Sequence, residues 1–322
     1  SMALHGAWKD VLSGQTDVSL AIAVEKTFSP DDPQRTMRLF DGGIDQYDRQ
    51  LWLDYYAAAG EAAGKPFEPG PGRTIFMDTY AMQAAWHMRT YGTTERQIAI
   101  ACAKNHSASV HNPKAQYRFA LTVDEVLADR PVSWPLTRAM CAPIGDGAAA
   151  ALVCSAAWLR RQPAAVQARA VRIAASTLTS GKYRQLDEPG LSRLAAERAY
   201  AAADLQASDI DLAEVHDATS FCELYQSEML GFCAPGEGGR LAESGATALG
   251  GSIPINLSGG LVSKGHPVGA TGLSMIDELV LQLRGEAGAR QVAGARTALA
   301  ENGGGVMGFD EAACSVIILQ RG

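Results

Sequence analysis

A histidine in a glycine-rich turn is the strongest candidate for chemistry in this sequence. The run Gly265-His266-Pro267-Val268-Gly269 stands just before an apolar helical pattern at Thr271–Leu283. Glycine allows tight turns and close backbone approach, and proline sets φ for the first turn of a helix. The free N–H groups at a helix N-terminus favour negative charge. We expect His266 to move a proton or stabilise an oxyanion. The alternative is a helix-capping loop with a surface histidine.

A second histidine ends an apolar strand pattern. His216 closes the strand expected at Leu212–His216, and a helical pattern at Phe221–Leu230 follows it. Ligands of α/β proteins gather where strands end. We therefore consider His216 a donor of a hydrogen bond to a developing oxyanion. The alternative is a histidine bonded to Asp217 in a structural turn.

A run of glycines follows a third strand pattern. Asn302-Gly303-Gly304-Gly305 comes directly after the apolar run Thr297–Glu301. Glycines in this position let a backbone approach a substrate, and the alternative is a flexible turn. Because His266, His216 and Asn302 all follow strands or open a helix, the sequence predicts that they face one cavity.

The other histidines and the cysteines carry weaker signals. His106 and His111 stand in a polar run typical of a loop, where capping is a commoner role than catalysis. Cys222 and Tyr225 follow His216 on the same expected helix; either could serve as an acid, although core packing is the commoner role. The six cysteines form no C-x-x-C pair and no zinc spacing with histidine, so we expect reduced thiols and no metal site.

Strands that alternate with helices must position these residues. Residues 1–13 predict a helix, and Ser19–Val24 predicts a strand that is apolar throughout and needs cover on both faces. Residues 27 to about 137 are richer in aromatic and polar residues and are interpreted as an inserted, mostly helical region. Inside it, a Pro/Gly cluster is found at Pro66–Gly72, and helices are expected around Asp45–Ala63, Thr79–Tyr91 and Thr94–Lys104. Further strands are expected at 148–155, 171–176, 212–216, 297–301 and 314–319, with helices at 191–205, 221–230 and 271–283. This alternation predicts an α/β architecture with a buried sheet.

Two segments repeat one order of elements: a helix, an apolar strand, an acidic residue and a turn. The first ends with the run Thr16–Lys26 and the second with the run Ala295–Gly305. In the second, Lys264–Gly272 precedes the helix; the corresponding part of the first would precede Ser1. We therefore expect two similar halves. The first is residues 1–160, which is incomplete and contains the inserted region at about 27–137, and the second is residues 161–322.

The composition excludes several classes of partner. The chain has 322 residues, 47% of them hydrophobic and 20% charged, with a formal net charge of −7. Because no block of lysine and arginine is present, we expect neither nucleic acid nor an anionic membrane as a partner. The longest apolar runs are too short for a membrane span, and no secretory signal pattern is visible. We therefore expect a cytoplasmic protein.

Taken together, these motifs are similar to the thiolases of the sterol-carrier-protein-x and lipid-transfer type. The ordered set of motifs runs essentially end to end and is far more specific than any single glycine motif. It comprises Lys104-Asn-His, Ser109-Val, Asn112-Pro, Met140-Cys-Ala-Pro, Asp146-Gly-Ala-Ala-Ala, Glu214-Val-His-Asp, Asn256, Ser258-Gly-Gly and Lys264-Gly-His-Pro-Val-Gly-Ala-Thr-Gly. The resemblance implies the thiolase fold, with two similar mixed-sheet α/β halves and an inserted loop domain, usually as a homodimer.

The resemblance also implies roles. The histidine corresponding to His266 activates a cysteine nucleophile and helps to form an oxyanion hole, and the one corresponding to His216 belongs to the other oxyanion hole. Substrate and coenzyme A binding falls to Asn302, Gly303, Gly304, Ser263 and Gly265. The coenzyme A thioester is the substrate, and no covalently bound cofactor is expected. The nucleophile would lie four residues before Ser1, outside this sequence.

One departure from the family pattern affects the expected reaction. Thiolases need an acid/base cysteine, and its two family locations correspond here to Ala218 and Asn302. The first expectation remains a thiolase-type acyltransferase that performs β-ketoacyl-CoA thiolysis or Claisen condensation. The second is a retro-aldolase acting on a β-hydroxyacyl-CoA, often with a small OB-fold partner protein. The third is a noncatalytic thiolase-like subunit.

Overall fold

Two sheets form the framework of the computed structural model, which describes residues 1–44, 46–70 and 73–322. The first pairs β1 (Val18–Glu25) with β4 (Gly147–Cys154) in antiparallel register. The second has the order β5 (Val171–Ser180), β8 (Ala313–Arg321), β7 (Thr297–Gly304), β6 (Leu212–Glu214). In it, β6 and β7 run parallel, whereas β5–β8 and β7–β8 are antiparallel. The predicted mixed α/β class is confirmed.

Two helices share the layer between the sheets. Helix α1 (Met2–Leu12) packs on β1, β4 and β5, and α12 (Thr271–Arg284) packs on β4, β7 and β8. Apolar residues recur at helical spacing on α12, which buries Leu273 and Ile276 in the same core as Leu4 of α1. The helices of the predicted repeat, which precede β1 and β7, therefore occupy equivalent positions.

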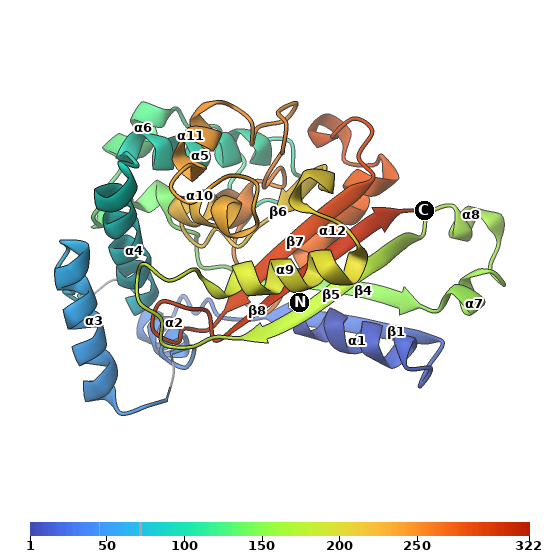
Figure 1. Cartoon of the computed structure of the whole chain (residues 1–322), viewed down its shortest axis with the longest axis horizontal. Coiled ribbons are helices and arrows are strands. Elements are labelled where there is room, and N and C mark those ends of the chain that lie inside the picture. Colours follow the sequence, from blue (N-terminus) through green and yellow to red (C-terminus); the bar gives the residue numbers. More distant parts are fainter. Residues whose placement is uncertain (45, 71–72) are drawn as a thin grey trace.

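The second sheet is covered on its other face as well. Helix α9 (Leu191–Ala203) packs on β5 and β8 and lies across them in Figure 1. Its buried alanines Ala195, Ala196 and Ala199 allow a close approach to the strands.

The first sheet is covered on one face by the described residues, so the cover on both faces expected for β1 stays a prediction. Ala21 points to the helix side and is buried. Leu20, Ile22 and Val24 point to the other side with exposed fractions of 57%, 58% and 64%. The continuous apolar run indicates which side chains of β1 favour burial, but it does not indicate which element or chain buries them.

The inserted region between β1 and β4 is mostly helical, as predicted. Its elements are α2 (Pro33–Asp41), α3 (Arg49–Ala63), α4 (Ile75–Tyr91), α5 (Glu95–Ser109), α6 (Val123–Ala128), β2 (Pro131–Ser133) and β3 (Leu136–Thr137). Asp45 of the predicted Asp45–Ala63 helix and residues 71–72 of the Pro66–Gly72 cluster lie outside the described residues.

The insertion packs onto the segment that follows β6. Helices α4 and α5 contact α10 (Ser220–Met229), and α5 also contacts α11 (Gly238–Glu243). Ile98 of α5 joins Phe221 and Leu224 of α10 in one apolar cluster. Figure 1 shows these helices grouped beyond one end of the second sheet. The insertion therefore closes over the end of β6, where His216 lies.

Short turns complete the fold. They are α7 (Ala156–Leu159), α8 (Ala164–Gln167), the 3-10 turns η1 (Arg138–Met140), η2 (Ala207–Asp209) and η4 (Gly288–Arg290), and the π turn η3 (Gly260–Lys264). Across the described ranges, no helix has the length and apolar character needed to cross a bilayer.

Candidate active site

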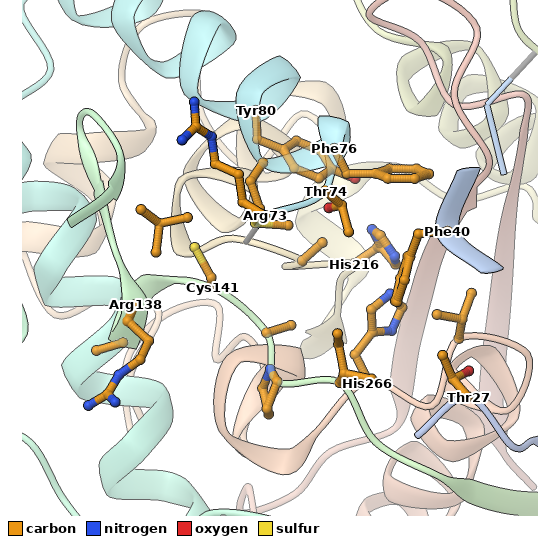
Figure 2. A pocket seen from close by; sticks show the side chains of 18 of the residues that line it. Thr27, Phe40, Arg73, Thr74, Phe76, Tyr80, Arg138, Cys141, His216 and His266 are labelled. Atoms are coloured by element: carbon orange, nitrogen blue, oxygen red, sulfur yellow. The ribbon is translucent and has the colours of Figure 1, made fainter. Parts of the chain in front are cut away.

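His216 and His266 open onto one cavity of about 1,090 Å³. His216 follows β6, and His266 stands in the loop before α12. Asn302, Gly303 and Gly304, at the end of β7, line the same cavity. The prediction that the two histidines and Asn302 face one space is confirmed. Figure 2 shows both imidazoles in the pocket, with Phe40, Phe76 and Tyr80 of the insertion around it.

The two imidazole rings meet edge to face. Their centroids are 5.0 Å apart and their planes make an angle of 76°. Burial lowers the pKa of His216 to about 4. Burial, followed by the charges of His216 and Lys264, holds the pKa of His266 well below its ordinary value. Both rings are therefore neutral near pH 7, and each offers one donor and one acceptor.

A hydrogen-bond chain sets the tautomer of His266. Its Nδ1 lies 2.7 Å from Oγ1 of Thr271. That hydroxyl donates to the carbonyl of Pro267 at 3.0 Å, which leaves it as the acceptor for the Nδ1–H of His266. Nε2 of His266 then carries a lone pair and can accept a proton. The loop thus presents a general base, which becomes a donor once protonated.

A buried polar network joins the segments that carry the two histidines. Glu214, in β6, accepts hydrogen bonds from the backbone N–H of Ser258 at 3.0 Å and from its hydroxyl at 2.5 Å. Lys264, two residues before His266, forms an ion pair with Glu214 at 3.3 Å. Both side chains of this ion pair are nearly inaccessible to solvent. The pair therefore holds the segment before the glycine-rich turn against β6.

Helix α5 contributes to the same network. Asn105 donates to Glu223 of α10 at 2.8 Å, and Lys104 forms an ion pair with Glu223 at 2.6 Å. Asn256 also donates to Glu223, at 3.1 Å. Lys104, Asn105 and Asn256 therefore hold the segments behind the two histidines in place and do not themselves line the cavity.

Two residues predicted to bind coenzyme A lie elsewhere. Ser263 is buried, donates to the hydroxyl of Ser109 at 2.7 Å and is not part of the cavity wall. Gly265 lines a second cavity of about 760 Å³ and has a φ of 108°, in the left-handed region that favours glycine. Their role in coenzyme A binding stays a prediction, and neither residue lines the cavity that the two imidazoles share.

His106 departs from its predicted loop. It lies in α5, is buried and lines the main cavity, with Nδ1 3.3 Å from the Ser263 hydroxyl. The polar run around it is not a solvent loop, because its polar side chains bond to buried partners across the insertion. His111, beyond the end of α5, is exposed.

Thiols near the cavity are not activated. Cys141 lines the cavity, and burial raises its pKa to about 12. Burial also raises the pKa of Cys222 to about 12, and its sulfur lies 3.3 Å from the Thr219 hydroxyl. A thiol with a raised pKa is a poor nucleophile near pH 7. Among the described residues, no group of three or more His, Cys, Asp or Glu side chains could hold a metal ion.

Glu311 is the cavity residue that the sequence motifs did not indicate. It precedes β8 and lines the cavity together with His216 and Asn302. Because β7 and β8 pair as antiparallel neighbours, residues just before β8 return to the end of β7. The two apolar runs predict the β7–β8 hairpin. They do not predict that the side chain of Glu311, in the connection, points to the cavity.

Comparisons with known proteins agree with this geometry. Residues 181–321 match the family model described as thiolase C-terminal domain-like. An acetyl-CoA acetyltransferase of Methanothermobacter thermautotrophicus is 38% identical over 312 residues, covering 95% of this chain and 74% of that protein. This chain belongs to the thiolase superfamily. The family inferred from the motifs is therefore confirmed.

Other thiolase-superfamily proteins are also similar to it. Sterol carrier protein 2 of Rattus norvegicus is 43% identical over 246 residues, covering 71% of this chain and 45% of that protein. The benzoylsuccinyl-CoA thiolase subunit BbsB of Thauera aromatica is 30% identical and covers 90% of this chain and 70% of its own length. The chain thus spans about three quarters of the archaeal relative and under half of sterol carrier protein 2.

Solved structures show the same fold. The Ltp2–ChsH2(DUF35) aldolase superposes with a TM-score of 0.77 at 23% identity, covering 99% of this thiolase-superfamily chain and 76% of that chain. The dimeric peroxisomal thiolase of Saccharomyces cerevisiae superposes with a TM-score of 0.63 at 14% identity, covering 100% of this chain and 73% of that one. The thiolase fold predicted from the motifs is confirmed.

Proposed function

We propose that this chain makes or breaks a carbon–carbon bond next to the carbonyl group of a coenzyme A thioester, as a thiolase-type acyltransferase. The observation that carries the proposal is the pair of neutral imidazoles, 5.0 Å apart, in one cavity. Both thiolysis of a β-ketoacyl-CoA and Claisen condensation pass through a thioester enolate. Fixed donors in a water-poor site stabilise such an oxyanion.

The two histidines have different roles in this proposal. His216 donates a hydrogen bond to the thioester oxyanion. His266 accepts a proton at Nε2, because its Nδ1–H is committed to Thr271. Once protonated, His266 becomes a second donor to negative charge.

Five basic side chains among the cavity-lining residues support a coenzyme A ester as substrate. They are Lys26, Arg35, Arg73, Arg130 and Arg138. Arg73 and Arg138 are oriented by ion pairs at 2.8 Å and 3.1 Å with Asp78 and Asp129. Guanidinium groups match phosphate oxygens in charge and geometry. The thioester arrives as substrate, so the proposal needs no covalently bound cofactor.

Covalent acyl transfer also needs a thiolate, which the proposal locates before Ser1. Ser1 packs against Gly272 in the first turn of α12, since a Cβ at Gly272 would collide with it. Ser1 therefore lies beside the start of the helix that follows the His266 loop. Because the thiols of Cys141 and Cys222 have raised pKa values, we expect no cysteine-dependent thiolysis by the 322 residues alone.

A second candidate is aldol cleavage of a β-hydroxyacyl-CoA. Ala218 and Asn302 line the cavity where thiolases carry acid/base thiols. Oδ1 of Asn302 is buried without a hydrogen-bond partner among the described residues, so it can accept a hydrogen bond from a substrate hydroxyl. The fold similarity to an aldolase agrees with this candidate. The similarity to a dimeric thiolase and to an aldolase that contains a DUF35 component also motivates a homodimer and a small DUF35-type OB-fold partner. A noncatalytic thiolase-like subunit is the third candidate.

Product analysis separates the candidates. The purified chain is incubated with acetoacetyl-CoA plus coenzyme A, and in parallel with a β-hydroxyacyl-CoA. The same two reactions are run on a chain extended by an upstream segment that contains a cysteine. Thiolysis only after extension supports the acyltransferase; release of an aldehyde or ketone with the thioester intact supports the aldolase. If both chains, with a DUF35-type partner added, catalyse neither reaction, the proposed function is contradicted. The noncatalytic subunit is then the remaining candidate.

A further inference from the structure

Carbon–carbon chemistry through a thioester enolate needs a group that exchanges a proton with the α-carbon. In this chain Ala218 and Asn302 stand at the two places where thiolases supply a thiol. Neither side chain can act as an acid or base near pH 7. Another group of the cavity wall can take this role, and Glu311 lines the same cavity as His216, His266 and Asn302.

The backbone around Glu311 is built to hold its side chain at the cavity. Gly303 leaves room for it: a Cβ at Gly303 would lie 2.9 Å from Oε1 of Glu311 and still closer to its Cγ and its carboxyl carbon. Gln226 of α10 donates to Oε1 at 3.3 Å. The Glu311 carboxyl group thus packs against Gly303 at the end of β7, and both residues line the cavity that the two imidazoles also line.

The preceding residue anchors this segment from the other side. Asp310 accepts a hydrogen bond from the buried guanidinium of Arg184 at 3.1 Å and another from the backbone N–H of Leu191 at 2.9 Å. Arg184 also donates to the carbonyl of Phe309 at 3.1 Å. Asp310, and not Glu311, forms the ion pair with Arg184, so the side chain of Glu311 can line the cavity.

Glu311 has the electrostatic character of a proton carrier. Within the described part of the chain, no basic side chain forms an ion pair with it. Burial, followed by the charge of Asp310, raises its pKa. Burial, followed by the charge of Glu311, also raises the pKa of Glu301, which accepts the backbone N–H of His216 at 3.0 Å. A carboxyl group in such surroundings releases and regains a proton nearer to neutral pH than an exposed one does.

Resting on the proposed function, we propose that Glu311 is the catalytic acid/base that moves the proton on the α-carbon of the substrate. In cleavage, the electrons of the broken carbon–carbon bond form the enolate, and the Glu311 carboxyl gives its proton to the α-carbon. The resulting carboxylate regains a proton from solvent. In condensation the carboxylate removes the α-proton, and the enolate electrons form the new carbon–carbon bond. The role is the same for the acyltransferase and for the aldolase.

Three other groups in or near the cavity keep their protons near pH 7. Tyr80 lines the cavity, and burial raises its pKa well above the ordinary value for a phenol. The thiols of Cys141 and Cys222, with pKa values of about 12, keep their protons near pH 7. None of the three can take up an α-proton there at an appreciable rate.

The test is loss of deuterium from α-deuterated acetyl-CoA and propionyl-CoA in ordinary water, followed by mass spectrometry. This exchange needs an oxyanion hole and a base, but no nucleophilic cysteine and no bond cleavage. Glu311→Gln is expected to slow it by about 10²-fold or more. The wild-type rate should rise with pH as Glu311 loses its proton, and the residual rate of Glu311→Gln should not.

Glu286→Gln is the matched control. Glu286 is not among the cavity-lining residues, and its carboxylate forms a surface ion pair with Arg169 that contributes little to stability. Its exchange rate should equal that of the wild type. If Glu311→Gln fails to fold, Glu311→Asp decides: its shorter carboxylate should slow exchange about tenfold or more and retain the pH dependence.

The outcomes separate the inference from the proposed function. Wild-type rates in a folded Glu311→Gln or Glu311→Asp protein overturn the role of Glu311, and the proposed function survives if histidine variants still abolish exchange. No exchange by the wild-type protein with either thioester overturns the proposed function and the inference together. A loss in Tyr80→Phe as large as in Glu311→Gln would also overturn Glu311 as the acid/base.

Discussion

The carboxylate of Asp217 accepts the backbone N–H of Leu261 at 2.6 Å. This bond joins the turn that carries His216 to the segment that leads into His266. The other oxygen of Asp217 accepts the amide of Asn105 at 2.9 Å, so a helix of the insertion is tied to the same point. A single buried carboxylate thus connects three segments that are far apart in the sequence.

Removing this carboxylate should destabilise the protein. Asp217→Ala leaves the Leu261 N–H buried without an acceptor, at a cost of about 1–3 kcal/mol, and removes one of the two acceptors of the Asn105 amide. Urea denaturation should therefore show a lower free energy of unfolding. Asp277→Ala is the control, because Asp277 forms an exposed ion pair with Lys114 that should contribute less than about 1 kcal/mol. Equal denaturation midpoints for the two variants would show that Asp217 does not hold the frame.

The positions of the two histidines could be predicted because local patterns define them. His216 follows a short apolar strand and His266 precedes an amphipathic helix, and the ends of such elements converge at one edge of a sheet. What the sequence could not show is the tautomer of His266, because it depends on the direction in which the Thr271 hydroxyl donates.

The prediction failed where the environment comes from distant elements. Glu311 stands in a hairpin connection, where acidic residues are usually solvated. Its desolvation depends on packing among segments more than a hundred residues apart, including Arg184, which orders the preceding aspartate. The same limit applies to His106, whose polar neighbours resemble a loop until their partners in η3 and beyond α5 are known.

The buried neutral histidine predicts a loss of stability in acid. Burial holds the pKa of His216 at about 4 in the folded protein, below the value near 6.5 expected on unfolding. The unfolded chain therefore binds more protons below about pH 6.5, and stability falls as the pH drops toward about 4. This histidine should account for roughly 3 kcal/mol of that fall.

Comparison of variants isolates this contribution. The free energy of unfolding of His216→Gln should decrease less between about pH 7 and about pH 4.5 than that of the wild-type protein. His111→Gln alters an exposed histidine and should behave like the wild type. An equal decrease in His216→Gln and wild type would mean that His216 is solvated in the folded state.

We predict a homodimer. Leu20, Ile22, Val24 and Leu152 form an apolar face on the first sheet with exposed fractions between 57% and 64%, which is unusual for a free surface. Light scattering at micromolar concentration should give a mass near twice the 34.0 kDa of one chain. A uniform species of 34.0 kDa would contradict the prediction.

The central claim is that His216 and His266 together stabilise a thioester enolate. The measurement that tests it most directly is the rate of α-deuterium loss from acetyl-CoA catalysed by His266→Ala, His216→Ala and the exposed-site control His111→Ala, with folding checked by circular dichroism. We expect each cavity variant to lose about 10²–10⁴-fold in rate and the control to match the wild type. A folded His266→Ala or His216→Ala protein that exchanges deuterium at the wild-type rate would contradict the claim.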